Sequence, residues 1–449
     1  MFRRLREFLF NTENRVIFSM FVPIVIEQLV ITMIGTVHTV MLSNVGKEAI
    51  SAVGLVDQLN QFAFAVFTSI SVGATVVVSQ YIGMGKPIAS KCTAEQAVII
   101  GTALSVVVGA VFVVFKSEVF GLFFGETEQA VKDFALIYLV ASAASFPMIS
   151  LTTTASGVIR GVGDARSPML ISTLMGITNA AIAAVCIFGL DLGVVGASIA
   201  LVSSRTIGAA VAVTIMLKKR LVRSFKNLFM IRPLYIKQIL RIGLYAGTEN
   251  IIFQGGKVLV QGFVVSAGTI HIAANSIAGS AFSLCAVPGN SMSIIATTLV
   301  GRYTGAGDKE GAYKSLHNIL LLSSGMLGLL NIALLPFTRQ IISMYTPEKE
   351  IADIVHTLFI MNIVCMPLFW SAAFVFFSGM KGAGDARYTT IISVVSMWCC
   401  RVLVGFILGK QLGMGVVGVW MGMFTDWIVR GIFALARFRS RKWQGKTVI

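Results

Sequence analysis

Apolar stretches long enough to cross a lipid bilayer recur along the whole chain, from Val16 to Phe438. A membrane-spanning helix needs about 20 mostly apolar residues. Only 12% of the residues are charged, whereas about 25% are charged in an ordinary soluble domain. We therefore predict an all-α integral membrane protein. Its twelve transmembrane helices are predicted at residues 16–42, 51–79, 92–115, 131–157, 167–190 and 193–217 in the first half, and at 236–267, 272–300, 314–336, 351–378, 388–409 and 414–437 in the second.

The basic residues alternate between successive loops, which predicts the orientation of the chain. Most lie before the first span, in every second loop and after the last span, while the other loops hold only Lys47, Lys116, Lys132, Arg339, Lys349 and Lys410. By the positive-inside rule both termini are cytoplasmic, in a multi-pass protein of the inner (plasma) membrane. We expect the net charge of +16 to meet anionic lipid headgroups and not nucleic acid. The six cysteines have no metal-ligand spacing, so neither a metal nor another cofactor is predicted.

The two halves of the sequence correspond when one is shifted by about 222 positions. Glu27 then falls on Glu249, QYIGMGK (80–86) on RYTGAGDK (302–309), and LGVVGAS (192–198) on MGVVGVW (414–420). Six is an even number of spans, so the repeats are parallel, an arrangement that recurs in transporters. We predict a six-helix lobe at 1–217, a basic cytoplasmic linker at 218–235 and a second six-helix lobe at 236–449, with the substrate path between the lobes.

Two glycine turns, RGVGDAR (160–166) and KGAGDAR (381–387), mark equivalent corners of the repeats. They lack the lysine and hydroxyl residue of a phosphate loop. Glycine permits a tight turn with positive φ, and Ser167 with Pro168 suits the start of the next helix. We expect the exposed arginines of the turns to anchor at headgroups and the aspartates to pair with neighbouring basic groups and latch one conformation. These residues are Arg166, Arg387, Asp164 and Asp385.

Twelve spans in two parallel halves, with RGxGD-like turns after the fourth and tenth spans, resemble the bacterial branch of the multidrug and toxic compound extrusion (MATE) family. The stretches PIVIEQLVITMIGTVHTVMLSNVG (23–46), QYIGMGK and ENIIFQGGKVLVQ (249–261) carry the resemblance, which covers nearly the whole chain. It implies a V-shaped pair of six-helix lobes around a central cleft. It also implies export of organic compounds in exchange for H⁺ or Na⁺.

Ionisable residues inside membrane spans are candidates for function. In the seventh span Asn250, Gln254, Lys257 and Gln261 share one helical face, with Glu249 beside it. Such a stripe faces either partner helices or a wet cavity, and its two charges favour the cavity. The resemblance implies that Glu249 occupies an acidic position used for cation coupling.

The first span repeats this pattern with Glu27 and His38 three turns apart, beside a stripe with Gln28 and Thr32. Many MATE proteins have an aspartate where this chain has His38, which carries a proton but is a poor Na⁺ ligand. His38 is alternatively a packing residue. Our hypothesis is that Glu249, supported by Glu27 at the equivalent position, carries coupling, with H⁺ preferred over Na⁺. Asp57 is a further candidate, which could also neutralise Lys257 or Arg401.

The remaining interior candidates concern the substrate. Arg401, with Trp398 one turn earlier, suits an anionic or aromatic group, or else a structural ion pair. Asp426 and Arg430 are spaced for an intrahelical pair, and Arg205 and Arg430 lie close enough to the cytoplasmic end to snorkel. The tenth span supplies candidate substrate contacts at Met361, Asn362, Met366 and Trp370.

The sequence as a whole predicts a secondary active exporter of amphipathic or cationic organic compounds that works by alternating access, as a monomer and not as an enzyme. The alternative is a flippase for lipid-linked or polysaccharide precursors, with Lys257 and Arg401 as phosphate ligands. A membrane-embedded transferase is a more distant alternative, because the spans hold no DDxxD-like cluster.

Overall fold

The computed structural model describes residues 12–42, 45–125, 128–223, 230–343 and 348–449, without the side chains of residues 12, 13, 35–40 and 341. All regular structure in these ranges is helical. The helices form two compact units, one of residues Ile26–Gly247 and one of Thr248–Ile449 together with the segment before Ile26. The units therefore divide inside two helices, and the lobe boundaries at 217 and 236 stay a prediction.

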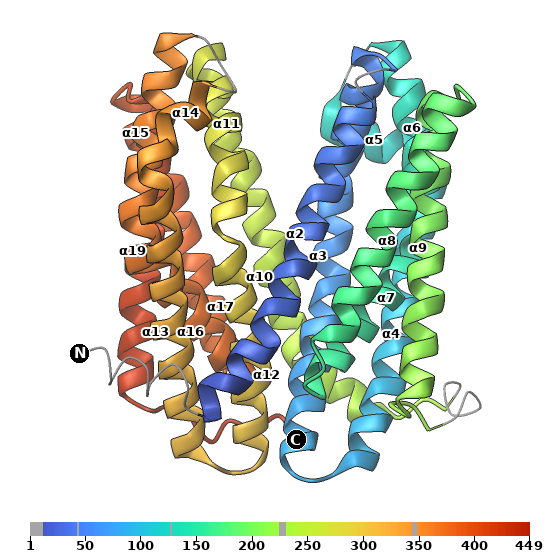
Figure 1. Ribbon diagram of the computed structural model, residues 1–449, viewed down its shortest axis with the longest axis vertical. Helices are drawn as coiled ribbons and strands as arrows, with labels where there is room; N and C mark the ends of the chain where they lie inside the picture. Colours follow the sequence, from blue (N-terminus) through green and yellow to red (C-terminus); the bar gives the residue numbers. More distant parts are fainter. Residues whose placement is uncertain (1–11, 43–44, 126–127, 224–229, 344–347) are drawn as a thin grey trace. The chain divides into compact units, whose positions relative to one another are not determined.

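The first unit holds the first predicted repeat from Ile26 onward, and the helices of this repeat can be followed in Figure 1 from blue to green. They are α2 (Thr12–Leu42), α3 (Lys47–Gly83), α4 (Pro87–Val114), α5 (Lys116–Phe124), α6 (Gln129–Ala144), α7 (Phe146–Gly161), α8 (Arg166–Ala184) with the π-helical segment η1 (Val185–Gly189), and α9 (Gly193–Lys218).

The second unit begins within α10 and holds the second repeat, drawn from yellow to red in Figure 1. Its helices are α10 (Pro233–Ser266), α11 (Thr269–Cys285), α12 (Val287–Gly305), α13 (Lys309–Leu334), η3 (Leu335–Phe337), α14 (Thr338–Ser343), α15 (Lys349–Cys365), η4 (Met366–Trp370), α16 (Ser371–Gly382), α17 (Ala386–Ser396), η5 (Met397–Val402), α18 (Leu403–Phe406), η6 (Ile407–Gln411) and α19 (Gly415–Arg439).

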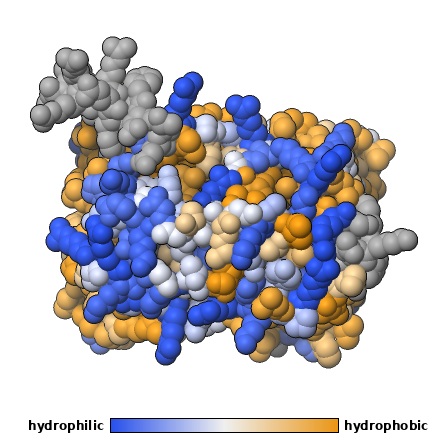
Figure 2. Space-filling model, turned by 90° about the horizontal axis from the view of Figure 1, so that it is seen from below, coloured by the Kyte–Doolittle hydropathy of each residue, from blue (hydrophilic) through white to orange (hydrophobic). Residues whose placement is uncertain are grey.

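Eleven of the twelve predicted spans are long and apolar enough to cross a membrane. Among the described residues nine helical runs meet this criterion singly, and the bent pairs α6 with α7 and α11 with α12 raise the number to 11. The remaining span is α10, a continuous helix of 34 residues that carries the predicted polar stripe. Figure 2 shows one end of the molecule, where hydrophilic side chains gather and hydrophobic ones lie around the margin. These features fit a multi-pass membrane protein.

Proline marks the bends in the spans. The pair α6 and α7 bends by 48° just before Pro147, and the pair α11 and α12 bends by 46° just before Pro288. Pro367 lies in the π-helical segment η4. The physical reason is that proline has no amide hydrogen and leaves a gap in the helical hydrogen-bond ladder.

A glycine contact between helices occurs at the same place in both repeats. A Cβ atom on Gly161 of α7 would lie 3.1 Å from the carbonyl oxygen of Thr75 in α3, and one on Gly382 of α16 would lie 2.4 Å from that of Thr297 in α12. Small residues at such crossings let membrane helices approach closely. Because Thr75 and Thr297 are also 222 positions apart, the repeat is preserved in the packing.

The basic linker is anchored on α4. Glu95 is fully buried and accepts hydrogen bonds from the backbone nitrogen of Arg223 at 2.7 Å and from its guanidinium at 3.0 Å. The side chain of Gln96 donates to the carbonyl of Met230 and accepts from the amide of Arg232, both at 2.8 Å. The described parts of the linker therefore lie against the first repeat.

Candidate functional site

The first residue of each glycine turn forms an ion pair with a predicted coupling acid. In the first unit, Arg160 at the end of α7 donates to Oε1 of Glu27 in α2 at 2.8 Å. Glu27 is only 3% exposed. Its second oxygen, Oε2, is buried and has no hydrogen-bond partner within the described ranges. The carboxylate thus has one satisfied oxygen and one free to take a proton or a further ligand.

The second unit contains the equivalent pair. Nζ of Lys381, near the end of α16, lies 2.7 Å from Oε2 of Glu249 in α10, and the Thr390 hydroxyl donates to the same oxygen at 3.2 Å. Glu249 and Lys381 correspond to Glu27 and Arg160 by the repeat offset. Sequence reasoning identified the acids but missed the bases. The signal was present, because each acid and the first residue of each turn keep the sign of their charge in both copies.

The aspartates of the turns also pair with neighbouring basic residues. Asp164 contacts Lys219, which follows α9. Asp385 contacts Arg437 of α19 at 2.8 Å and Lys446 beyond that helix at 3.1 Å. Arg166 and Arg387 are exposed, as headgroup anchors require. The pairings lie within single units, while a latching role for them stays a prediction.

The helix start after the first turn differs from the prediction. Asp164, and not Ser167, provides the capping carboxylate, because its Oδ1 accepts from the amides of Arg166 and Ser167 at 3.0 and 3.2 Å. Burial raises the pKa of Asp164, but hydrogen bonds from Lys219 and Ser167 outweigh it and lower the pKa below its usual value. The predicted positive φ is confirmed at Gly163 (85°) and Gly384 (99°).

A polar network extends from Asp57 into the first unit. Asn60 donates to exposed Asp57 at 3.3 Å and accepts from the hydroxyl of Ser142 at 2.9 Å. Arg205 donates to Ser145 at 2.7 Å and contacts Ser142. Arg205 is only 6% exposed, so the prediction that it snorkels was wrong. Hydroxyl groups in the bend between α6 and α7 satisfy the guanidinium locally.

The predicted stripe of α10 changes from half-buried to exposed along the helix. Asn250 and Gln254 are half-buried, whereas Lys257 and Gln261 are exposed. The oxygen of Gln261 accepts from Asn275 of α11 at 3.0 Å. Asn275 in turn accepts from the indole of Trp420 in α19 at 2.9 Å. The interpretation of the stripe as a contact with partner helices is therefore observed at Gln261, whereas the wet cavity stays a prediction.

Three cations of the second unit surround the ring of Phe253 on α10. Lys257, Arg401 of η5 and Arg430 of α19 lie 5.3, 5.5 and 5.6 Å from its centroid. The predicted Asp426–Arg430 pair is confirmed at 2.9 Å, with exposed fractions of 0% and 2%. Arg430 is therefore buried as well, and the prediction that it snorkels was wrong. The expected pairing of Asp57 with Lys257 or Arg401 would join the two units and stays a prediction.

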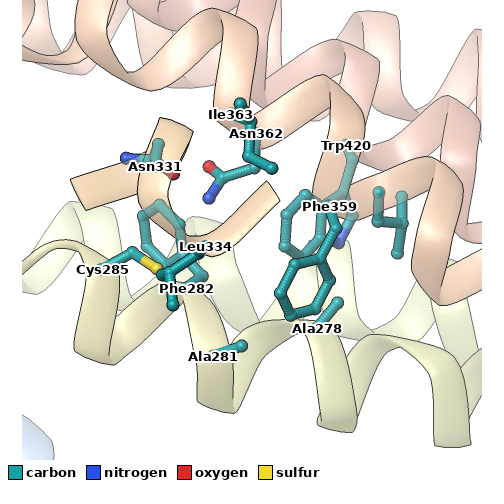
Figure 3. A pocket seen from close by; sticks show the side chains of 11 residues that line it. Ala278, Ala281, Phe282, Cys285, Asn331, Leu334, Phe359, Asn362, Ile363 and Trp420 are labelled. Carbon is teal, nitrogen blue, oxygen red and sulfur yellow. The ribbon is translucent and has the colours of Figure 1, made fainter. Parts of the chain in front are cut away.

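A small cavity in the second unit lies between α11, α13, α15 and α19 (Figure 3). Its volume of about 10 Å³ holds about one water. Asn362 lines it, and the Oδ1 of this residue is buried without a hydrogen-bond partner among the described residues. Asn331, which sequence reasoning missed, donates to the sulfur of Met366 at 3.7 Å, and Asn362 donates to the same sulfur at 3.9 Å. Trp420 also lines the cavity, so the chain of bonds from Gln261 ends there.

The other predicted residues lie outside these clusters. Met361 is half-buried, Trp370 is 4% exposed and stacks on Phe374, and Trp398 is 41% exposed. In α2, Thr32 donates to the backbone oxygen of its own helix at Gln28. The side chain of His38 lies outside the described residues. Within the described ranges no group of three or more His, Cys, Asp or Glu residues is placed to hold a metal ion.

Comparison with known proteins places this geometry in context. The sequence model of the MatE family matches residues 23–185 and 246–407, one range within each of the two predicted repeats. A Thermotoga maritima protein named probable multidrug resistance protein NorM is 28% identical over 95% of this chain and 92% of its own length. The Bacillus subtilis protein named uncharacterized transporter YisQ is 26% identical over 95% and 94%.

Solved structures agree in fold. The outward-facing structure of a multidrug resistance MATE family transporter of the MOP superfamily has a TM-score of 0.89 at 20% identity, covering 97% of this chain and 98% of its own. A MOP superfamily transporter from Pyrococcus furiosus, described as having a binding pocket of reverse polarity, has a TM-score of 0.86 at 20% identity, covering 97% of both chains.

Proposed function

The chain belongs to the MatE family, and from this premise we propose that it is a secondary active antiporter that exports organic compounds across the inner membrane. Inward flow of H⁺, or alternatively Na⁺, drives the export through alternating access. The protein acts as a monomer with both termini in the cytoplasm, and as a transporter and not an enzyme. The observation that carries the proposal is the duplicated acid–base pair, Glu27 with Arg160 and Glu249 with Lys381.

The pairs suit proton coupling because either a proton or the basic side chain can compensate the negative charge of each carboxylate. Protonation of Glu249 neutralises the acid and leaves the charge of Lys381 uncompensated, which is unfavourable in a poorly solvated site. The protonated state therefore favours a rearrangement in which Lys381 finds water or another acceptor, and release of the proton restores the pair. A sodium ion bound at Oε2 of Glu249 would compete with the ammonium group of Lys381, which lies 2.7 Å from that oxygen. This competition supports H⁺ over Na⁺.

The same logic applies to Glu27, with one difference. Its guanidinium partner occupies Oε1, and buried Oε2 has no hydrogen-bond partner among the residues that the structure describes. A proton on Oε2 would not need to displace the guanidinium. We therefore assign the main coupling role to Glu249 and a supporting role to Glu27, with Asp57 and His38 as further candidates.

Transport by the Glu249→Gln variant tests the assignment. In proteoliposomes this variant should lose efflux driven by a pH gradient while it keeps gradient-free exchange of labelled substrate across the membrane. Glu310→Gln is the matched control, because Glu310 forms an exposed ion pair with Arg441 in the same unit. Undiminished gradient-driven efflux by Glu249→Gln would contradict the proposal.

A double variant separates coupling from a purely structural ion pair. If Glu249 only neutralises Lys381, removal of both charges in Glu249→Gln/Lys381→Met should restore gradient-driven efflux. If Glu249 carries the proton, the double variant should recover folding and exchange but not gradient-driven efflux. Imposing H⁺ and Na⁺ gradients separately identifies the ion.

The flippase alternative is favoured by one specific observation, the cations Lys257 and Arg401 beside Phe253. A flippase would move a lipid phosphate and would be indifferent to added dyes. Efflux of cationic, neutral and anionic dyes from the same proteoliposomes distinguishes it from an exporter. The transferase alternative predicts a covalently changed product, which mass spectrometry of the compounds recovered from the proteoliposomes would reveal.

A further inference from the structure

The cations around Phe253 come from three separate helical segments of the second unit. Lys257 is on α10, Arg401 on η5 and Arg430 on α19, and Arg430 also lies 5.2 Å from the ring centroid of Phe374. A cation over an aromatic face gains about 0.5–2 kcal/mol. That gain is small beside the penalty for a charge within a membrane. The aromatic ring alone therefore does not account for three positive charges in one place.

Asp426, the acid of this cluster, uses both carboxylate oxygens to bind one of the three cations, Arg430. Both oxygens of Asp426 accept from Arg430, at 2.9 and 3.0 Å, and Oδ1 also accepts from the hydroxyl of Ser396. Asp426 attracts Arg401, while Arg430 repels it, and Arg401 in turn repels Lys257. Within the described part of the chain no ion pair includes Lys257 or Arg401, and the Nε of Arg401 is buried without a hydrogen-bond partner. Two positive charges thus remain without a counter-charge there.

The backbone brings these two charges together. Gly256 of α10 faces the side chain of Met397 in η5, whose terminal methyl would lie 2.5 Å from a Cβ atom on Gly256, so the two segments are in contact at this point. Lys257 and Trp398 are the next residues on the two segments, and both are exposed. Arg401 lies in the π-helical segment Met397–Val402. Such segments often mark functional positions.

We propose that Lys257 and Arg401 form a binding site for the oxyanion group of an amphipathic organic anion, a phosphate or a carboxylate on an apolar body. The guanidinium supplies a planar pair of donors that matches an oxyanion, and the ammonium supplies a mobile point charge. Phe253 and Trp398 offer aromatic surface to the apolar body. The inference rests on the proposed transport function and names a substrate class for it, which is opposite in charge to a cationic drug.

Equilibrium binding to the purified full-length protein in detergent tests the site. Decyl phosphate should bind, monitored by isothermal titration, and decyltrimethylammonium of equal chain length should not compete. Lys257→Gln and Arg401→Gln should each weaken decyl phosphate binding about ten- to a hundredfold, the usual effect of losing one hydrogen bond to a charged group. Arg401→Lys keeps the charge without the planar donors and should lie between Arg401→Gln and the unchanged protein.

Lys410→Gln is the matched control. Lys410 also lies near an aromatic ring, 5.9 Å from the centroid of Phe406, but it is an exposed residue near the end of the same span. Its substitution should leave decyl phosphate binding unchanged. Equal binding of the cationic probe, or equal affinities for Lys257→Gln, Arg401→Gln and Lys410→Gln, would overturn the proposal.

Reconstitution distinguishes the two sources of such an anion. In nanodiscs of phosphatidylcholine alone, decyl phosphate should bind as in detergent. If addition of phosphatidic acid weakens this binding, a lipid headgroup occupies the site, whereas unchanged binding assigns it to soluble amphiphiles, and both results support an oxyanion site. These measurements need no ion gradient. Binding without gradient-driven efflux therefore contradicts only the proposed antiport, and efflux without anion binding contradicts only this inference.

Discussion

The buried pair of Asp426 and Arg430 offers the sharpest test of the electrostatics of the second unit. The side chains are 0% and 2% exposed, so neither charge can be hydrated in place. The Asp426→Asn substitution keeps the shape of the side chain and removes its charge. Removing one partner of a buried ion pair usually destabilises a protein by about 3–5 kcal/mol, because the other charge is left uncompensated.

Two features of the structure modify this magnitude in opposite directions. Arg430 keeps the backbone oxygen of Ser393 at 3.3 Å and two aromatic rings within 5.6 Å, which reduces the penalty. The substitution also removes the acid that attracts Arg401, which increases the penalty. We therefore expect a loss of about 4 kcal/mol in the free energy of unfolding, the middle of the range. The Asp426→Asn/Arg430→Met variant should recover most of this loss.

Titration with sodium dodecyl sulfate, followed by circular dichroism on the detergent-purified protein, measures the free energy of unfolding. The exposed pair Glu310–Arg441, with side chains 52% and 51% exposed, provides the comparison. Glu310→Gln should cost about 0–1 kcal/mol. The reasoning is refuted if Asp426→Asn loses no more stability than Glu310→Gln, or if the double variant is less stable than Asp426→Asn.

Two further predictions concern the glycine turns. The lowered pKa of Asp164 means that its contribution to stability is complete above its unfolded pKa of about 4 and is lost as pH falls through the lower folded value. Asp164→Asn should thus lower the free energy of unfolding at pH 7 by about 1 kcal/mol at most, since its pair with Lys219 is partly exposed. On acidification to pH about 3, the variant should lose less stability than the unchanged protein, as measured by thermal unfolding. Gly382→Ala should destabilise by about 1–3 kcal/mol, because its Cβ would lie 2.4 Å from the rigid carbonyl of Thr297. The equivalent Gly161→Ala, with its nearest atom at 2.9 Å on a side chain, should be milder in the same detergent titration, and an equal loss would argue against the steric explanation.

The spans and the duplication were predictable because both depend on local properties of the sequence. Apolar length determines which segments cross a membrane, and the family model matches the chain twice at the expected offset. The pair Asp426–Arg430 was predictable for the same reason, since a spacing of four residues brings side chains together on any helix. The exception is α10, which carries the polar stripe and is not among the spans that meet the length and hydropathy criterion.

The partners of isolated charges were not predictable, because tertiary packing selects them. Arg205 was expected to reach the headgroups, but the bend before Pro147 presents hydroxyl groups to it inside the unit. Glu27 and Glu249 were expected to face a shared cleft, and the conserved sign of charge at the first residue of each glycine turn did not by itself show that this residue approaches the acid. The structure reports these pairings within single units, and a shared cleft remains a hypothesis.

The comparison of the two repeats separates residues of two kinds. The acid–base pairs at Glu27 and Glu249 are preserved in both copies, as expected for a role that both halves share. The cluster around Phe253 is not preserved. Arg401 and Asp426 correspond to Asn179 and Ser204, which form a neutral hydrogen bond of 3.1 Å in the first repeat.

The interior charges are distributed unevenly between the two repeats. The first repeat links Asp57 to Arg205 through hydrogen bonds, whereas the second leaves Lys257 and Arg401 unpaired among the described residues. The second repeat thus has a cationic cluster where the first repeat has a neutral contact, and the proposed oxyanion site accounts for this difference. Saturating decyl phosphate should accordingly restore part of the stability lost in Asp426→Asn, because a bound anion replaces the missing charge near Arg401. Gly382→Ala, which leaves the proposed site intact, should gain only as much stability from decyl phosphate as the unchanged protein, and an equal gain in both variants would show that the anion does not replace the missing charge.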